Sequence, residues 1–148
     1  MEAFDNFADN PNGVISDKKR NLEWLPKDSY GDLGRWVNFQ EAESYCGTMI
    51  SVYAGGHDDW RLPTQEETLD LFNKDLNQLD WEGEHVHIHP LFVAKCARHI
   101  WTSEENDKNQ ALVVNLQDGS TEFMDKENMD KESKDKIAVR LVRAVSSK

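Results

Sequence analysis

Residues 60–67 read Trp-Arg-Leu-Pro-Thr-Gln-Glu-Glu, and this stretch fixes where one helix of the domain begins. Thr64 and Glu67 stand directly after Pro63 and form a capping-box pair, which is typical of a helix N-terminus. Apolar side chains then recur at helical spacing, at Leu69, Phe72, Leu76 and Leu79. The pattern predicts a helix whose apolar stripe extends as far as Leu79 and packs against a sheet.

The same helix signature occurs once more, upstream. Asn38 and Glu41 form a second capping-box pair. Apolar side chains follow on one helical face, at Phe39, Ala42, Cys46 and Met49. Gly47 weakens the helix near its end, so we expect the helix to stop around residue 49. The sequence therefore predicts two helices, both in the first half of the chain.

The rest of the chain favours strands. Short strands are predicted on both sides of the helices, at 14–16, 21–25, 99–103, 111–116 and 120–124. Asp118-Gly119 between the last two is a strong hairpin signal. Residues 125–136 are almost wholly charged and predict a solvated loop, and the apolar run 137–145 predicts a final buried strand. Two helices followed by a β-rich half indicate an α+β domain.

Length and composition indicate one folded domain. The chain has 148 residues, a common domain size, and 9% of them are aromatic. Disordered segments are poor in aromatic residues, and a chain of this length can bury a sizeable core. We interpret residues 1–12 as a lead-in segment and residues 13–148 as a single domain.

The formal net charge of −11 argues against several partners. A protein that neutralises nucleic-acid phosphates needs clustered Lys and Arg, and here only residues 137–148 are basic. DNA, RNA, sulfated polysaccharides and anionic membrane surfaces are therefore not expected as partners. No apolar stretch reaches the roughly 18 residues of a membrane span, so no membrane insertion is expected. The first residues do not resemble a signal peptide, which predicts a cytoplasmic protein if Met1 is the native start.

Several segments, in order along the chain, resemble one bacterial family. They are 13–17 (Gly-Val-Ile-Ser-Asp), 22–24 (Leu-Glu-Trp), 41–46 (Glu-Ala-Glu-Ser-Tyr-Cys), 60–63 (Trp-Arg-Leu-Pro), 100–103 (Ile-Trp-Thr-Ser), 113–119 (Val-Val-Asn-Leu-Gln-Asp-Gly) and 139–143 (Val-Arg-Leu-Val-Arg). The family is a domain of unknown function typified by the C-terminal domain of the Legionella collagen-like adhesin. The resemblance spans roughly residues 12–145, and its most specific piece is Trp-Arg-Leu-Pro before a helix.

The resemblance implies a fold similar to C-type lectins and to the formylglycine-generating enzyme. Such a fold has two helices, a small antiparallel sheet in which the first and last strands pair, and a long irregular loop region, here about residues 77–98. Trp24, Trp60 and Trp101 then belong to the core, and Trp60 and Trp101 should be more than about 80% buried. The resemblance also implies a location at the cell surface or outside the cell.

The cysteines depart from the family pattern. Lectin-like domains usually bond a Cys of the first helix to a Cys of the last strand. In this sequence the helix position is Cys46, but the last-strand position is Leu141. The other thiol of the chain is Cys96. We expect Cys46 to be a buried free thiol, and a bond between Cys46 and Cys96 is the alternative.

Residues 84–89, Glu-His-Val-His-Ile-His, form the polar cluster that most strongly suggests a binding site. In an extended chain His85, His87 and His89 share one face, and the two apolar residues share the other. Three imidazoles, with Glu82 or Glu84 as a further ligand, suit Zn²⁺ or another divalent transition metal if the chain bends. A metal-dependent enzyme or metal-binding domain is therefore one hypothesis, and a solvated polar loop is the other. No other cofactor is expected.

Other chemistry finds less support in the sequence. The lectin calcium patterns Glu-Pro-Asn, Gln-Pro-Asp and Trp-Asn-Asp are absent, although residues 104–107 offer oxygen ligands on an acidic loop. The formylglycine-generating relatives use two cysteines in the second half, where this chain has only Cys96. Gly-rich phosphate loops, Gly-x-Ser-x-Gly and His-Glu-x-x-His motifs are absent as well.

The sequence therefore favours a non-enzymatic binding module that recognises a protein or glycan through its long loop region. The candidate binding residues are Trp81, Glu84, His85, His87 and His89. Trp81 precedes Glu-Gly-Glu, which leaves its indole partly exposed for stacking on a sugar or filling a protein pocket. The alternative is that Trp81 closes the core. The negative charge favours a neutral or basic partner. Because the adhesin relative assembles as a trimer, a subunit that contacts its own copies is a third hypothesis.

Overall fold

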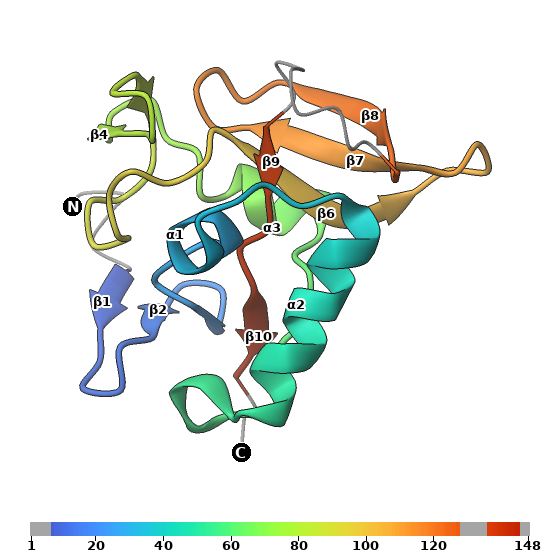
Figure 1. The fold of residues 1–148 in the computed structure, drawn as a ribbon. Coiled ribbons are helices and arrows are strands. Elements are labelled where there is room, and N and C mark those ends of the chain that lie inside the picture. Colours follow the sequence, from blue (N-terminus) through green and yellow to red (C-terminus); the bar gives the residue numbers. More distant parts are fainter. Residues whose placement is uncertain (1–6, 128–135, 146–148) are drawn as a thin grey trace.

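In the computed structural model, which describes residues 7–127 and 136–145, the chain forms three α-helices, two four-stranded sheets and a two-stranded ribbon. The helices are α1 (Ser29–Leu33), α2 (Phe39–Ser51) and α3 (Gln65–Leu69), and a 3₁₀ turn, η2, covers Ala54–Gly56. The architecture is α+β, as predicted, with α2 along one side of the molecule (Figure 1). Among the described residues, no helix is long and apolar enough to cross a membrane.

The first sheet joins the two ends of the domain. Its strands are β1 (Phe7–Asp9), β2 (Ile15–Asp17), β3 (Leu22–Trp24) and β10 (Val142–Ala144), in the order β1-β2-β3-β10. All neighbours are antiparallel, and Val142 lies opposite Trp24. The predicted pairing of the last strand with the early strands is confirmed. Strand β1 lies within the segment that we interpreted as a lead-in, where it extends this sheet.

The second sheet contains the three strands predicted in the second half. They are β6 (His99–Glu105), β7 (Gln110–Asn115) and β8 (Thr121–Asp125), and β9 (Ile137–Ala138) completes the order β8-β7-β6-β9. Gly119, with φ +77°, takes the left-handed conformation that the turn between β7 and β8 requires. The expected small antiparallel sheet is the first one, whereas in the second sheet β9 pairs with β6 in parallel. Most of the predicted charged loop, 128–135, lies outside the described residues.

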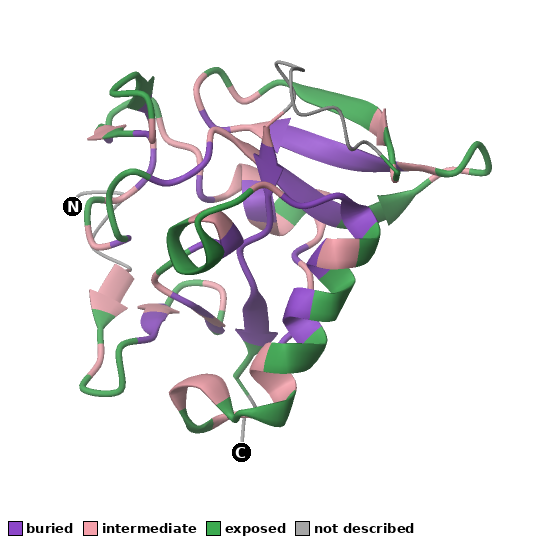
Figure 2. Cartoon of the chain, in the orientation of Figure 1, coloured by how far each residue is buried: buried purple, intermediate pink, exposed green. Residues whose placement is uncertain are grey.

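The single strand predicted at 137–145 is wrong, because the run divides between the two sheets as β9 and β10. Between them the backbone bonds to loop segments instead. Val139 N–H donates to Ser29 Oγ at 3.0 Å, and Leu141 C=O accepts from Leu25 N–H at 3.1 Å. The run is mainly apolar, and even Arg140 and Arg143 are buried, because it passes through the core between the sheets, as the buried β9 and β10 in Figure 2 illustrate.

Helix α2 begins at the predicted capping box. Asn38 Oδ1 accepts from Glu41 N–H at 2.8 Å, and Glu41 Oε1 accepts from Asn38 N–H at 2.9 Å. Helix α1 was not predicted, so the expectation of two helices is wrong by one. Its five residues are too few for a periodic apolar pattern, although Asp28 caps it through the N–H of Gly31 at 2.8 Å.

Helix α3 also begins at its predicted capping box but is far shorter than predicted. It ends at Leu69, and Leu79 lies in a short strand with 47% of its surface exposed. After Asp70 the chain turns away, because Asn73 N–H donates to the His87 carbonyl at 2.9 Å instead of to the helix. A contact with the following loop therefore overrides the local helical pattern.

The core consists of two clusters of buried side chains. One contains Trp60 and Trp101, whose exposed fractions are 2% and 0%, as predicted. The other contains Trp24 and the buried parts of the first sheet. Cys46 and Cys96 are both buried and free, which confirms the prediction of a free thiol at Cys46.

We predict that replacing Glu67 by glutamine lowers the free energy of unfolding by about 1–2 kcal/mol near neutral pH. Glu67 accepts from Arg61 Nη1 and Nη2, both at 2.8 Å, and from Thr64 N–H at 2.9 Å. Burial raises the pKa of the Glu67 carboxyl, but these hydrogen bonds outweigh it and hold the pKa below its ordinary value. A carboxyl with a lowered pKa stabilises the fold above about pH 4.3, and the contribution is lost as the pH falls through the folded-state pKa.

Urea unfolding at two pH values measures this effect. The difference between the wild type and Glu67→Gln should shrink as the solution becomes acidic. Glu66→Gln is the matched control, because Glu66 is the exposed neighbour in the same helix turn. If the free energy of unfolding of Glu67→Gln depended on pH as that of the wild type does, the stabilising role of the Glu67 carboxylate would be contradicted.

Candidate functional site

The segment between α3 and β6 forms the long loop region predicted from the sequence. It contains only the short ribbon of β4 (Gln78–Leu79) and β5 (His85–Val86). His87 N–H donates to the Leu116 carbonyl at 3.0 Å, and Lys95 N–H donates to the Leu79 carbonyl at 3.0 Å. These bonds tie the loop to the second sheet and to itself, so its residues are held at defined positions.

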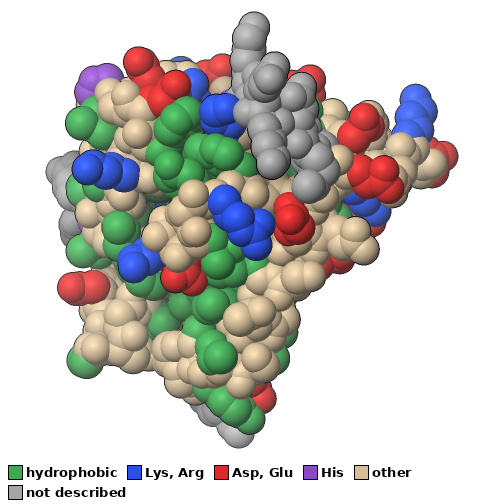
Figure 3. Space-filling view, viewed as in Figure 1, with side chains coloured by type: hydrophobic (Ala, Val, Ile, Leu, Met, Phe, Trp, Pro, Cys, Tyr) green, Lys and Arg blue, Asp and Glu red, His purple; other side chains and the backbone are tan. Residues whose placement is uncertain are grey.

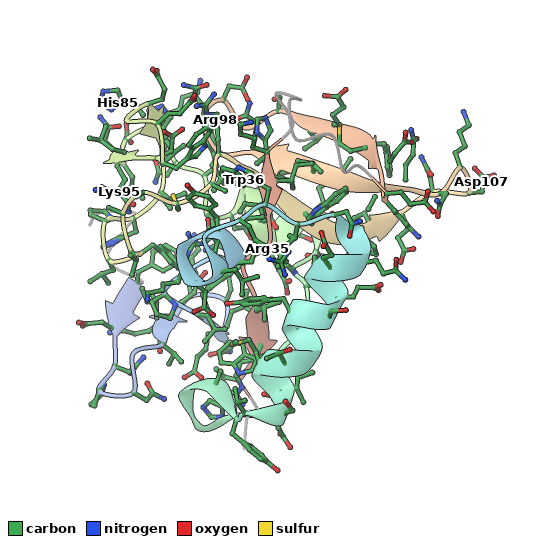
Figure 4. All side chains as sticks on the ribbon, in the orientation of Figure 1. Arg35, Trp36, His85, Lys95, Arg98 and Asp107 are labelled. Carbon is green, nitrogen blue, oxygen red and sulfur yellow. The ribbon has the colours of Figure 1, made fainter. Side chains whose placement is uncertain are left out.

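The predicted alternation of the histidine run is confirmed. Val86 and Ile88 are fully buried, whereas His85 is exposed and the other two histidines are half-buried. In Figure 4, His85 lies at an outer corner of the molecule, well apart from Trp36. The run thus contributes its apolar residues to the core and its imidazoles to the surface.

Each imidazole has its own hydrogen-bond partner. His85 Nδ1 bonds to Asn77 Oδ1 at 2.8 Å, His87 Nδ1 donates to the Leu76 carbonyl at 2.9 Å, and His89 Nδ1 accepts from Leu91 N–H at 3.0 Å. Within residues 7–127 and 136–145, no three His, Cys, Asp or Glu side chains are grouped to hold a metal ion. The geometry therefore gives the metal-binding hypothesis no support. Glu84 is exposed, and its backbone rather than its side chain shapes the turn.

Trp81 lies in a group of three aromatic side chains that we call the Trp81 cluster (Tyr30, Trp36 and Trp81). Trp36 stacks on Tyr30 with ring centroids 4.0 Å apart and an interplanar angle of 10°. Trp81 meets Trp36 edge-on, with centroids 5.0 Å apart at 68°. All three residues are half-buried, so Trp81 neither stands alone in solvent nor belongs to the closed core.

The buried carboxylate of Asp80 fixes the position of Trp81. Asp80 Oδ1 accepts from the N–H groups of Glu82 and Glu84, both at 2.9 Å, and closes the turn. Asp80 Oδ2 accepts from Arg98 Nε at 2.8 Å. Trp81 N–H donates to the Cys96 carbonyl at 2.9 Å. With the backbone held on both sides, the indole is presented on a rigid turn, which limits the entropy lost when a ligand binds.

Sequence reasoning missed the other two members of the cluster. Tyr30 lies on α1 and Trp36 lies in the turn between α1 and α2, in a segment without a periodic pattern. The residue after Trp36 is anchored, because Val37 N–H donates to the Ile137 carbonyl at 3.0 Å. The Asp28 cap before Tyr30 was the one local signal that could have placed this segment.

The charges close to Trp81 nearly balance, although the whole chain is strongly acidic. Arg98 Nη2 donates to Glu82 Oε1 at 2.6 Å, and Lys136 Nζ lies 5.9 Å from the Trp81 ring centroid. Burial lowers the pKa of the Arg98 guanidinium, but the hydrogen bonds to Asp80 and Glu82 outweigh it and raise the pKa, so Arg98 stays charged. Figure 3 shows hydrophobic side chains gathered on the upper part of this face beside Lys and Arg. The surface therefore combines aromatic rings with a locally neutral polar border.

The fold and this surface define a small α+β domain that presents an anchored aromatic cluster next to a long loop. The chain belongs to the Lcl C-terminal domain family, whose model matches residues 13–143. This confirms the resemblance to the C-terminal domain of the Legionella collagen-like adhesin and makes the chain an adhesin-related bacterial domain. No curated protein and no solved structure matches the chain significantly.

Proposed function

We propose that the domain is a non-enzymatic binding module that recognises a protein or glycan ligand through the surface centred on Trp81. An uncharged sugar ring or an apolar side chain would stack on the half-exposed indole, with Arg98 and Glu82 as polar neighbours. The observation that carries the proposal is the Trp81 cluster itself, three contiguous half-buried rings at the edge of a loop region. Aromatic side chains that are partly exposed and held rigidly are frequent contact residues in binding sites.

We infer further that the domain shares the architecture of C-type lectins. Three features support this inference: the pairing of β3 with β10, the placement of α2 and α3 in the first half, and the long loop region before β6. In such an architecture the sheets and helices form the base, and the loop region is free to vary for recognition. The Trp81 cluster lies where that loop meets the base.

Replacing Trp81 by alanine is expected to reduce binding at least tenfold and to lower the free energy of unfolding by only about 1–2 kcal/mol. A ligand is first identified by screening an array of neutral oligosaccharides and by capturing proteins from the source organism. Affinity and urea unfolding are then measured on the same variant. Phe123→Ala is the matched control, because Phe123 is also aromatic and 40% exposed but lies on β8.

Two results would count against this assignment. Unchanged affinity in Trp81→Ala together with lowered stability would make Trp81 a core residue and move the binding surface elsewhere. An equal loss of affinity in Phe123→Ala would mean that the effect does not depend on the Trp81 cluster.

Chelation of divalent metal with EDTA is expected to leave both binding and the melting temperature unchanged. The lectin calcium patterns are absent from the sequence, and the part of the chain that the structure describes offers no group of three metal-ligating side chains. Differential scanning fluorimetry with and without EDTA tests this directly. A fall in melting temperature that added Ca²⁺ or Zn²⁺ restores would contradict a metal-independent module.

A further inference from the structure

A second surface, separate from the Trp81 cluster, is hollowed beside α2. It is a groove of about 600 Å³ between one face of α2, the segment before α3 and the outer half of β6. Its lining is mainly apolar and comes from Phe39, Cys46, Ile50, Trp60 and Leu62. The Cys46 thiol donates to the Trp60 carbonyl at 3.3 Å, and burial raises the thiol pKa, so the floor of the groove is uncharged. The volume is within the usual range of about 300–1,000 Å³ for ligand sites.

Gly47 lines this groove from the middle of α2, and nothing in the fold requires a glycine there. Its φ lies outside the left-handed region, and a Cβ added to it would meet no atom within 4 Å. Glycine in a helix interior is less favourable than alanine, because it orders more backbone for no added contact. The missing side chain leaves the wall of the groove open, which is the arrangement expected where another chain approaches the helix closely.

Among the described residues, one carboxylate on the border of the groove has no counter-charge. Arg61 is neutralised by two hydrogen bonds to Glu67, and Glu105 forms an ion pair with Lys126. Glu43, on the exposed side of α2, has no ion-pair partner among the described residues. An apolar groove with an unpaired acidic border, on a chain of net charge −11, is complementary to a basic and apolar partner.

We propose that this groove binds a short segment of a partner protein in which apolar side chains are flanked by Lys or Arg. The apolar side chains would lie against Ile50, Leu62 and the open wall at Gly47, and a basic side chain would pair with Glu43. A fatty acid or an acidic peptide would place its own negative charge against Glu43. The site uses no residue of the Trp81 cluster, so it extends the proposed function instead of depending on it.

Two synthetic peptides and one helix variant test the proposal. The first peptide carries Phe-Leu-Val between lysines, and the second carries the same core between glutamates. Isothermal titration calorimetry should detect the lysine peptide and no more than a tenth of that affinity for the glutamate peptide. Bound lysine peptide should also slow the alkylation of Cys46 by N-ethylmaleimide, which mass spectrometry measures. The alkylation of Cys96, which lies outside the groove, is the internal reference.

Gly47→Leu is the decisive variant, because it fills the groove without disturbing the core. We expect it to abolish peptide binding while the melting temperature stays the same or rises by about 2 °C. Thr48→Leu is the matched control, since Thr48 is exposed on the same helix but does not line the groove. Glu43→Gln should weaken binding of the lysine peptide by about two- to fivefold.

Several outcomes would overturn the proposal. They are the absence of any binding of the lysine peptide, equal binding of both peptides, and unchanged binding in Gly47→Leu. A concentration-dependent dimer in light scattering that Gly47→Leu abolishes would make a second copy of the chain the occupant, which also contradicts it. Trp81→Ala should leave the binding of the lysine peptide unchanged, so failure here is distinguishable from failure of the proposed function.

Discussion

Replacing Trp60 by alanine is expected to lower the free energy of unfolding by about 3–5 kcal/mol, because it opens a large cavity in the core. Trp60 is only 2% exposed and packs with Trp101 and the buried face of α2. Its Nε1–H donates to the Ala54 carbonyl at 2.8 Å, so the indole also holds the η2 turn in place. Urea unfolding followed by far-ultraviolet circular dichroism measures the loss.

Phenylalanine variants separate the cavity from the hydrogen bond. Trp60→Phe keeps an aromatic ring but leaves the Ala54 carbonyl without its donor. Trp24 is equally buried, yet its Nε1–H has no acceptor among the described residues. Since an unsatisfied buried donor is itself costly, Trp24→Phe should be less destabilising than Trp60→Phe by about 1–2 kcal/mol. The packing argument fails if Trp60→Ala costs less than about 1 kcal/mol.

Replacing Asp28 by alanine is expected to lower the free energy of unfolding by about 3–5 kcal/mol. The Asp28 carboxylate is 1% exposed and accepts from Gly31 N–H at 2.8 Å and from Ala97 N–H at 2.6 Å. It also lies 3.9 Å from Arg140 Nη2, and the Arg140 side chain is fully buried. The substitution therefore removes the cap of α1, frees a buried N–H and leaves a buried guanidinium without its counter-charge.

The controls distinguish the charge from the cap. Asp28→Asn keeps an oxygen for the Gly31 N–H and removes the charge. Its free energy of unfolding should therefore lie between those of the wild type and Asp28→Ala. Arg140 has few other partners: Nη1 donates to the Pro26 carbonyl at 2.9 Å, and the guanidinium carbon lies 4.7 Å from the Phe92 ring centroid. A double variant with Arg140→Leu should recover part of the loss, because it no longer buries an unpaired cation. Additive losses in the double variant would mean that the two side chains do not interact.

The sequence alone determined the elements whose signals are local. The capping boxes at Asn38 and Thr64 placed the starts of α2 and α3, because both partners of each box lie within one turn of helix. Asp118-Gly119 placed the turn between β7 and β8 for the same reason. Strand alternation also predicted that Val86 and Ile88 share the face opposite the histidines, and the structure places both in the core. The ordered motifs from residue 13 to residue 143 were enough to indicate the family.

The tertiary structure alone decided features that depend on contacts between distant residues. Helix α3 ends early because Asn73 bonds to the His87 carbonyl, and the apolar run 137–145 divides because its backbone meets Ser29 and Leu25. The candidate site is of this kind as well. Trp81 was named from its sequence neighbours, but Tyr30 and Trp36 join it only because the Asp80 turn and the α1 segment meet in space. Local patterns report which backbone conformation a segment prefers, whereas the packing of segments far apart in sequence decides which preferences persist and which side chains share a surface.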